Sequence, residues 1–243
     1  LASAFTDHLA TVALDPVDPD ILFAGTRPAA LFRSRDGGQH WQQLTVDLAA
    51  ECPDVRIPRV TSLVVDPSDH NLVWAGIEVD GVRRSLDGGE TWTRINGGLP
   101  IPDIHDIVVS VAKPKTVVVA ANREIFVSTD TGASWHPLGV NKRFSFPYCR
   151  SLALRADDPQ VLFVATGDEA IGSTGGIQRS RDRGQSWELL PFPGETNTPI
   201  WTFATHAADP DRIVACSHYG QLFVTNDGGD SWVKLHREFA EIR

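Results

Sequence analysis

The stretch "SRDGGQHW", residues 34–41, decides how this sequence is interpreted, because the chain repeats its pattern. Four further stretches fit S/T-x-D-x-G-x-x-W: "SLDGGETW" (85–92), "STDTGASW" (128–135), "SRDRGQSW" (180–187) and "TNDGGDSW" (225–232). We call these five stretches the octets. Their aspartates are Asp36, Asp87, Asp130, Asp182 and Asp227. Self-similarity at a period of about 40 to 50 residues predicts a solenoid, a propeller or another repeat array.

Each octet lies within a set of four short runs that have the composition of β-strands. In residues 60–94 the runs are "VTSLVVDP", "NLVWAGIEV", "GVRRS" and "TWTRI", rich in Val, Ile, Thr and Trp and separated by turn residues. We name the four strands A, B, C and D in chain order. The connection from A to B contains Asp-Pro or Lys-Pro in every repeat, and proline ends a strand by fixing φ. We find no long helical period.

In this scheme the octet is the turn from strand C to strand D. Its glycine supplies a backbone conformation with positive φ, and the aspartate accepts hydrogen bonds from amides of the turn. We expect the Ser or Thr hydroxyl to bond to the neighbouring strand, and the tryptophan to begin strand D and lie against the adjacent sheet. A role repeated in five equivalent corners is structural, so the octet aspartates are not expected to be catalytic.

The octets resemble the Asp box, or BNR repeat, of sialidases, sorting receptors and other β-propellers. The resemblance covers almost the whole chain and implies an all-β propeller of four-stranded antiparallel blades. The expected blades cover approximately residues 8–48, 59–97, 104–139, 149–192 and 200–236 of a single domain. The resemblance does not imply one activity, because function depends on the site and not on the fold.

The segment 237–243 follows the fifth strand D, where each earlier repeat begins its next strand A. We therefore expect it to start a further blade. The interpretation that follows is five complete blades of a six-bladed parent, completed by an N-terminal segment that precedes Leu1. A closed five-bladed ring is the alternative.

Composition restricts the partners. The formal net charge of −9 disfavours nucleic acid and anionic membranes, and no run is apolar enough to span a membrane. The chain begins without a signal peptide, which favours the cytoplasm, although a lost leader would leave secretion open. Three isolated cysteines do not form a disulfide framework or a zinc site, so we expect free, buried or half-buried thiols and neither a metal nor a cofactor. They are Cys52, Cys149 and Cys216.

The candidate site is the mouth of the central channel, which the D–A and B–C loops form on the side opposite the octets. Loops on a rigid scaffold carry function disproportionately, and these loops vary while the frame is constant. The predicted ligand-binding residues are Arg59, His105, Arg150, Trp201 and His218. Arginines at the mouth, among them Arg123 and Arg243, favour an anionic ligand held by Arg59 and Arg150, with Trp201 as a stacking surface. Acidic residues in the same loops, such as Glu78 and Glu169, would weaken that field.

Two classes of function remain open at this point. The first is a propeller without catalytic activity that binds a small anionic ligand, a glycan or a protein at the channel mouth. The alternative is a glycoside hydrolase of the sialidase type, or another hydrolase or lyase, that acts on an acidic substrate. "VRIP" at 55–58 resembles a sialidase motif but lacks its aromatic residue. The sequence does not decide between an enzyme and a binding protein.

Overall fold

The computed structural model describes residues 8–53, 55–100 and 102–241 of the 243-residue chain. Contacts divide the chain into two compact units. The first consists of the residues up to 119 together with 128–136, and the second consists of 120–127 and the residues from 137 onward. Each unit is described by itself. The described residues contain no α-helix, and their only helical turn is the short 3-10 turn η1 (Val140–Lys142).

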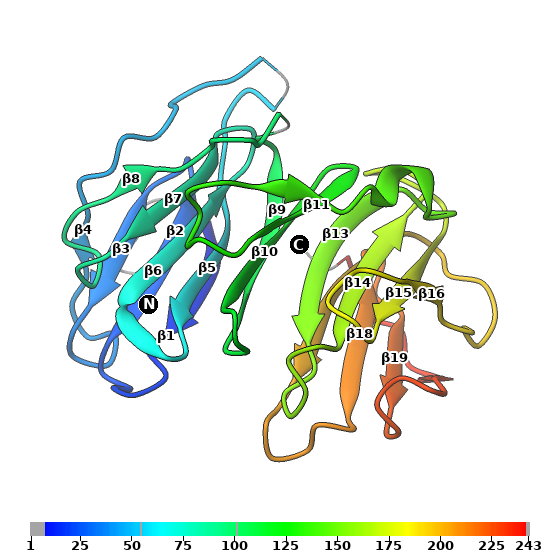
Figure 1. Ribbon diagram of the computed structural model, residues 1–243. Coiled ribbons are helices and arrows are strands. Elements are labelled where there is room, and N and C mark those ends of the chain that lie inside the picture. The colour runs from blue at the N-terminus through cyan, green and yellow to red at the C-terminus, as the bar shows by residue number, and fades with distance from the viewer. Residues whose placement is uncertain (1–7, 54, 101, 242–243) are drawn as a thin grey trace. The chain divides into compact units, whose positions relative to one another are not determined.

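The strands form five four-stranded sheets, which are the predicted blades, each with its strands in chain order (Figure 1). Blade 1 contains β1 (His8–Leu14), β2 (Leu22–Arg27), β3 (Leu31–Ser34) and β4 (Gln42–Gln43). Blade 2 contains β5 (Val60–Asp66), β6 (Asp69–Ile77), β7 (Gly81–Ser85) and β8 (Thr93–Arg94). Blade 3 contains β9 (Ile104–Ser110), β10 (Thr116–Ala121), β11 (Glu124–Ser128) and β12 (His136–Pro137). Blade 4 contains β13 (Tyr148–Leu154), β14 (Leu162–Gly167), β15 (Gly175–Ser180) and β16 (Glu188–Leu189). Blade 5 contains β17 (Ile200–Thr205), β18 (Ile213–Ser217), β19 (Leu222–Thr225) and β20 (Val233–Lys234).

The strand register defines two opposite edges in each blade. In blade 4, Tyr148 at the start of β13 pairs with Gly167 at the end of β14, which pairs with Gly175 at the start of β15. We call this edge, where A begins, B ends and C begins, the mouth edge. The octets occupy the other edge, which we call the octet edge. The predicted site residues therefore belong to one edge and the octet aspartates to the other.

Apolar side chains pack between consecutive blades within each unit. Val60 of β5 is fully buried in a cluster with Phe23 and Leu31 of blade 1. Gly25 in β2 is required there, because a Cβ atom at this position would lie 2.5 Å from the Cβ atom of Val60. A second cluster joins blades 4 and 5 around Phe163 and Phe223. Within the units, the first strand β5 lies against β1 and β9, and β13 lies against β17, as in the inner strands of a propeller.

The octets form the predicted C–D corners, and one hydrogen-bond pattern recurs in all five, except that the His40 ring takes the place of the hydroxyl on Oδ2 in blade 1. In blade 2 the buried Ser85 hydroxyl donates to Asp87 Oδ1 at 2.7 Å and accepts the amide of Gly89 at 2.8 Å. Asp87 Oδ1 also accepts the amide of Thr91 at 2.9 Å, and Oδ2 accepts its hydroxyl at 2.6 Å. The expectation that the Ser hydroxyl reaches the neighbouring strand was wrong, because the hydroxyl is held inside its own turn.

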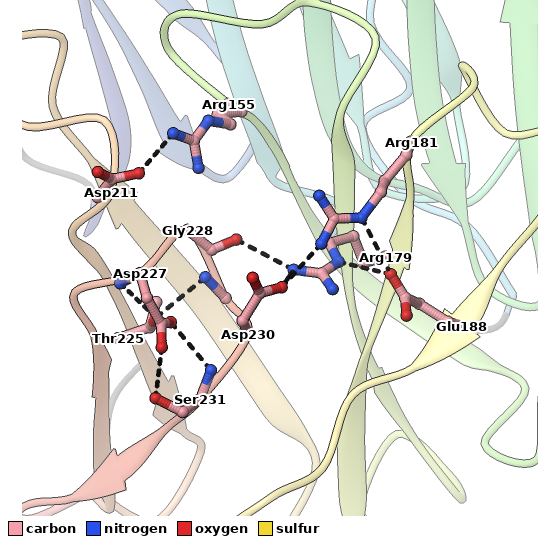
Figure 2. Close-up of polar contacts among 11 residues, drawn as sticks. Arg155, Arg179, Arg181, Glu188, Asp211, Thr225, Asp227, Gly228, Asp230 and Ser231 are labelled. Atoms are coloured by element: carbon pink, nitrogen blue, oxygen red, sulfur yellow. Dashed lines mark hydrogen bonds and ion pairs between the residues drawn. The ribbon is translucent and has the colours of Figure 1, made fainter.

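Arginines on strand C, namely Arg33, Arg84 and Arg179, donate to a backbone carbonyl in the octet of the next blade, and two of them also reach a carboxylate there. Arg179 of β15 is 4% exposed, and its guanidinium donates to Glu188 of β16 and to Asp230 in the octet of blade 5, both at 2.7 Å (Figure 2). It also donates to the carbonyl of Gly228 at 3.2 Å. In blade 1, Arg33 repeats this with the Gly88 carbonyl at 2.6 Å and Glu90 at 2.8 Å. We call these two arrangements the arginine clamps.

The chain therefore has the all-β fold of a β-propeller with five four-stranded antiparallel blades, as the sequence predicts. The described part of the last segment, residues 237–241, contains no strand, and the amide of Phe239 donates to the Gly220 carbonyl of blade 5 at 2.9 Å. Residues 242–243 lie outside the described residues. The single-domain organisation and the six-bladed parent remain predictions.

Candidate functional site

All five predicted ligand-binding residues lie at the mouth edges of their blades. Arg59 immediately precedes β5, His105 is the second residue of β9, and both belong to the first unit. Arg150 in β13, Trp201 in β17 and His218 after β18 belong to the second unit. The structure brings the last three together. It shows separate local contacts for Arg59 and His105. Arg243 lies outside the described residues.

A row of four planar side chains occupies the mouth edge of the second unit. The Arg150 guanidinium lies over the Trp201 ring, 4.1 Å from its centroid. The His218 ring lies 4.2 Å from Trp201, and the Tyr219 ring lies 5.2 Å from His218, centroid to centroid. We call Arg150, Trp201, His218 and Tyr219 the stacked row. Cation–π attraction and offset ring contacts stabilise such an arrangement.

β-Bulges explain why Arg150 and Trp201 come from different strands to the same place. The pairing of β13 with β14 shifts between Cys149 and Ser151, which makes Arg150 the extra residue. The pairing of β17 with β18 shifts between Ile200 and Thr202, which makes Trp201 the extra residue. A bulged residue is released from the alternation of the strand, and bulges often redirect a side chain next to a site.

The turn after β18 presents the other half of the row. It spans Ser217–Gly220, closed by the Gly220 amide donating to the Ser217 carbonyl at 3.1 Å. Gly220 has a φ of 80°, and a Cβ atom there would lie 2.2 Å from the Phe239 carbonyl oxygen. His218 Nε2 forms an ion-pair contact of 3.2 Å with Glu241. The segment after β20 therefore passes directly over this turn.

Tyr219 is the exposed end of the stacked row, with 47% of its surface accessible, whereas Trp201 is half-buried. The sequence predicts that Trp201 offers the stacking surface. In the structure its ring already contacts Arg150 and His218, so Tyr219 presents the more accessible ring. The sequence places Tyr219 in a B–C turn next to His218. That position does not indicate which ring of the stacked row is exposed.

Carboxylates accompany the basic residues at the mouth edges. Arg123 donates to both carboxylate oxygens of Glu169 at 2.7 Å. Arg59 Nε lies 3.4 Å from Glu78 Oε1, and His105 Nε2 lies 3.4 Å from Asp103. These contacts offset the positive field on which the expectation of an anionic ligand rests.

The three cysteines are free, and burial raises the pKa of the Cys149 and Cys216 thiols, so both stay protonated at neutral pH. Within the described ranges, no three His, Cys, Asp or Glu side chains are grouped so that they could hold a metal ion. The same ranges contain no helix long and apolar enough to cross a membrane.

Solved structures with a similar fold include two GH74 enzymes. A GH74 enzyme from Niastella koreensis matches 93% of this chain with a TM-score of 0.74 and 20% identity, over 38% of its own length. A GH74 xyloglucanase from Xanthomonas campestris matches 93% of this chain with a TM-score of 0.72 and 19% identity, also over 38% of its length. At this level of identity the likeness establishes the β-propeller fold.

Proteins with similar sequences are also xyloglucanases. Xyloglucanase Xgh74A of Acetivibrio thermocellus is 25% identical over 279 residues, covering 93% of this chain and 32% of that protein. An oligoxyloglucan-reducing end-specific xyloglucanase of Emericella nidulans is 25% identical over 233 residues, covering 91% and 26% respectively. The chain thus spans less than a third of the length of these relatives. No protein-family model matches it.

Proposed function

We propose that this chain is part of a glycoside hydrolase of the xyloglucanase type and that the stacked row binds glycan. The observation that carries the proposal is the similarity to xyloglucanases along 93% of the chain. It favours the hydrolase alternative over a propeller without catalytic activity. We also propose that the octets are Asp boxes in the sense of the BNR repeat, with the structural role described above.

The chemistry of the stacked row supports a glycan ligand. Sugar rings present C–H faces that pack on aromatic rings, and their hydroxyls bond to neighbouring polar groups. Tyr219 offers an exposed ring, and Arg150 and His218 offer polar atoms beside it. Ligand sites commonly combine aromatic surface with a few polar groups in this way.

The substrate we propose differs from the acidic one expected from the sequence. Xyloglucan is an uncharged polysaccharide, so it does not require a cationic site. The pairing of Arg123 with Glu169 and the contact of Arg59 with Glu78 agree with an uncharged ligand. Most glycoside hydrolases use two carboxylates, and the mouth edges supply carboxylates from several blades.

Affinity electrophoresis through gels containing xyloglucan tests the binding. We expect retardation of the wild-type protein, and about tenfold weaker binding for Tyr219→Ala, the equivalent of about 1.4 kcal/mol. Tyr219→Phe retains the ring and should bind nearly normally. Leu86→Ala removes an exposed apolar side chain at the octet edge and serves as the control. Equal retardation of wild type and Tyr219→Ala would exclude the stacked row as the binding surface.

Hydrolysis is measured separately, by the release of reducing ends from xyloglucan. We expect activity in the longer protein to which the chain belongs, and a lower rate at limiting substrate for Tyr219→Ala. Retardation by xyloglucan without release of reducing ends from the longer protein would instead support the non-catalytic interpretation.

A further inference from the structure

The turn that carries the exposed ring of the stacked row is contacted from two sides. On one side is the D–A loop of blade 4, where the Tyr219 amide donates to Thr198 Oγ1 at 3.2 Å and Asn197 Nδ2 donates to the Tyr219 carbonyl at 3.3 Å. On the other side is the segment 237–241, which follows β20. The bonds from the D–A loop hold the backbone of Tyr219, whereas its ring depends on other contacts.

The segment 237–241 lies against the backbone of this turn. The Phe239 amide donates to the Gly220 carbonyl at 2.9 Å. A Cβ atom on residue 220 would lie 2.2 Å from the Phe239 carbonyl oxygen, so a side chain there would displace the segment. Glycine is thus required for the close approach of two backbones, in addition to its positive φ.

Side-chain contacts of Glu238 also fix the course of the segment. Its Oε1 lies 2.7 Å from Nζ of Lys234 in β20, and it accepts a hydrogen bond from Nε2 of the buried Gln221 at 3.3 Å. Both partners belong to blade 5, so the segment is attached to the blade that carries the turn. Glu241 is thereby brought to the stacked row, where its Oε1 lies 3.2 Å from His218 Nε2.

The His218 ring connects Glu241 to Tyr219. Among the described residues, the Glu241 carboxylate is the only polar partner of this ring, because the buried Nδ1 atom has no hydrogen-bond partner there. The ring otherwise contacts Trp201 and Tyr219, with centroid distances of 4.2 and 5.2 Å. The orientation of the Tyr219 ring therefore depends on His218, and that of His218 depends on Trp201 and Glu241.

Blade 5 differs from the other blades in what this turn carries. A backbone contact between a B–C turn and the following segment is not special, since in blade 2 the Gly81 amide donates to the Pro102 carbonyl at 2.8 Å. The B–C turns of the other four blades, however, contain no histidine or aromatic residue. In blade 5 the turn presents two adjacent rings, His218 and Tyr219, and the segment adds a carboxylate to one of them.

We propose that Glu241 is a positioning residue of the glycan site, which holds the His218 ring so that Tyr219 presents its face to the sugar. The segment 237–241 brings Glu241 into place, and Gly220 admits the segment. A ring that is held in its bound orientation loses less conformational entropy when the ligand binds, which favours affinity. The ligand class in this inference rests on the proposed function, and the positioning rests on the contacts within blade 5.

A double-mutant cycle tests the inference. We expect Glu241→Ala to raise the dissociation constant for xyloglucan oligosaccharides, measured by calorimetry, about fivefold, as for the loss of one polar contact. Because Glu241 acts through Tyr219, the double variant Tyr219→Ala/Glu241→Ala should bind no more weakly than Tyr219→Ala alone. The control is Glu195→Ala, which removes an equal charge from an exposed residue of the blade 4 D–A loop and should bind normally.

NMR of the tyrosine rings gives a readout that requires no ligand. The chain contains two tyrosines, Tyr219 and the buried Tyr148, so ring-labelled protein gives two sets of signals. We expect Glu241→Ala to shift the Tyr219 signals and to leave those of Tyr148 in place. Glu238→Ala, which releases the segment from two of its contacts, should shift the Tyr219 signals in the same direction.

The outcomes separate this inference from the proposed function. Unchanged Tyr219 signals in Glu241→Ala overturn the inference whether or not xyloglucan binds. The Glu241 side chain is 39% exposed, so additive losses in the double variant would show that it contacts the ligand itself, which also overturns the positioning role. Normal binding by Glu241→Ala with weak binding by Tyr219→Ala leaves the proposed function standing alone. Failure of the wild-type protein to bind xyloglucan contradicts the proposed function, and the NMR signals then decide the positioning role.

Discussion

At the scale of single residues, the octets show how an exposed carboxylate can be structural. Hydrogen bonds lower the pKa of Asp36, Asp87, Asp130 and Asp182 from the ordinary 3.8 to about 2, and they lower that of Asp227 as well. For Asp87 the largest cause is the Thr91 hydroxyl, followed by the Thr91 amide and the Ser85 hydroxyl. The charged form is therefore part of the folded corner, five times in one chain.

The lowered pKa values predict a specific loss of stability in acid. A folded pKa below the unfolded one contributes stability that is complete above about pH 4 and is lost as the pH falls from about 4 to about 2. At pH 3 each octet should take up just under one proton, roughly 0.8, on unfolding. The slope of unfolding free energy against pH, from denaturant titrations between pH 2.5 and 5, measures this uptake. Asp87→Asn should reduce it by about one octet's share, and an unchanged slope would contradict the structural role.

At the scale of strands and turns, the arginine clamps hold neighbouring blades in register. Arg179 is buried, while Glu188 and Asp230 are about half exposed, and Arg181 reaches the same two carboxylates from the surface (Figure 2). Because the partners can be solvated if the clamp is lost, the arrangement contributes less than a fully buried ion pair. It supplements the apolar cluster between blades 4 and 5.

The clamp predicts unequal effects for two arginines that share their partners. Arg179→Met should lower the unfolding free energy by about 1–3 kcal/mol, because it removes three hydrogen bonds of a buried charged group. Arg181→Met, whose side chain is 58% exposed, should cost less than about 1 kcal/mol. Urea titrations of both variants measure the difference. Equal losses of unfolding free energy in the two variants would show that burial does not distinguish Arg179 from Arg181.

The same scale shows what the sequence can reveal. The octets predict the C–D corners, the four-stranded blades and the positions of the two blade edges. They can do so because turn formation depends on local sequence and the same turn motif occurs five times. The bulges at Arg150 and Trp201 depend on pairing with a second strand, which no local pattern records. Side-chain partners across blades, such as Glu78 for Arg59, are likewise absent from the sequence. The sequence therefore predicts a site at the mouth edge, and both that site and the charge of its ligand remain predictions.

At the scale of the whole molecule, the net charge of the protein bears on the charge of the ligand it can hold. The chain carries a formal charge of −9, so an anionic ligand would have to be held against a repulsive field, whereas an uncharged glycan would not. The acidic residues found beside the mouth-edge arginines strengthen this contrast.

Salt dependence distinguishes the two classes of ligand. We expect the dissociation constant for xyloglucan oligosaccharides to change by less than about twofold between 50 and 500 mM NaCl, because screening acts on charge pairs. Polygalacturonate, an acidic polysaccharide, should bind weakly under all these conditions. Tight binding of polygalacturonate that weakens with salt would restore the anionic ligand expected from the arginines.

The arginine clamps also bear on how such a chain can be rebuilt by recombination. Each clamp takes its arginine from one repeat and its acid from the next, as Arg33 does with Glu90 and Arg179 with Asp230. The blade 3 octet has Ala133 where those acids stand, so moving it behind blade 1 would leave the buried Arg33 guanidinium without its carboxylate partner. Exchanging blade 2 for blade 5 would supply the missing carboxylate. A single blade is thus interchangeable where its octet keeps the acid that the preceding arginine needs, and gene duplication or shuffling should respect that pairing.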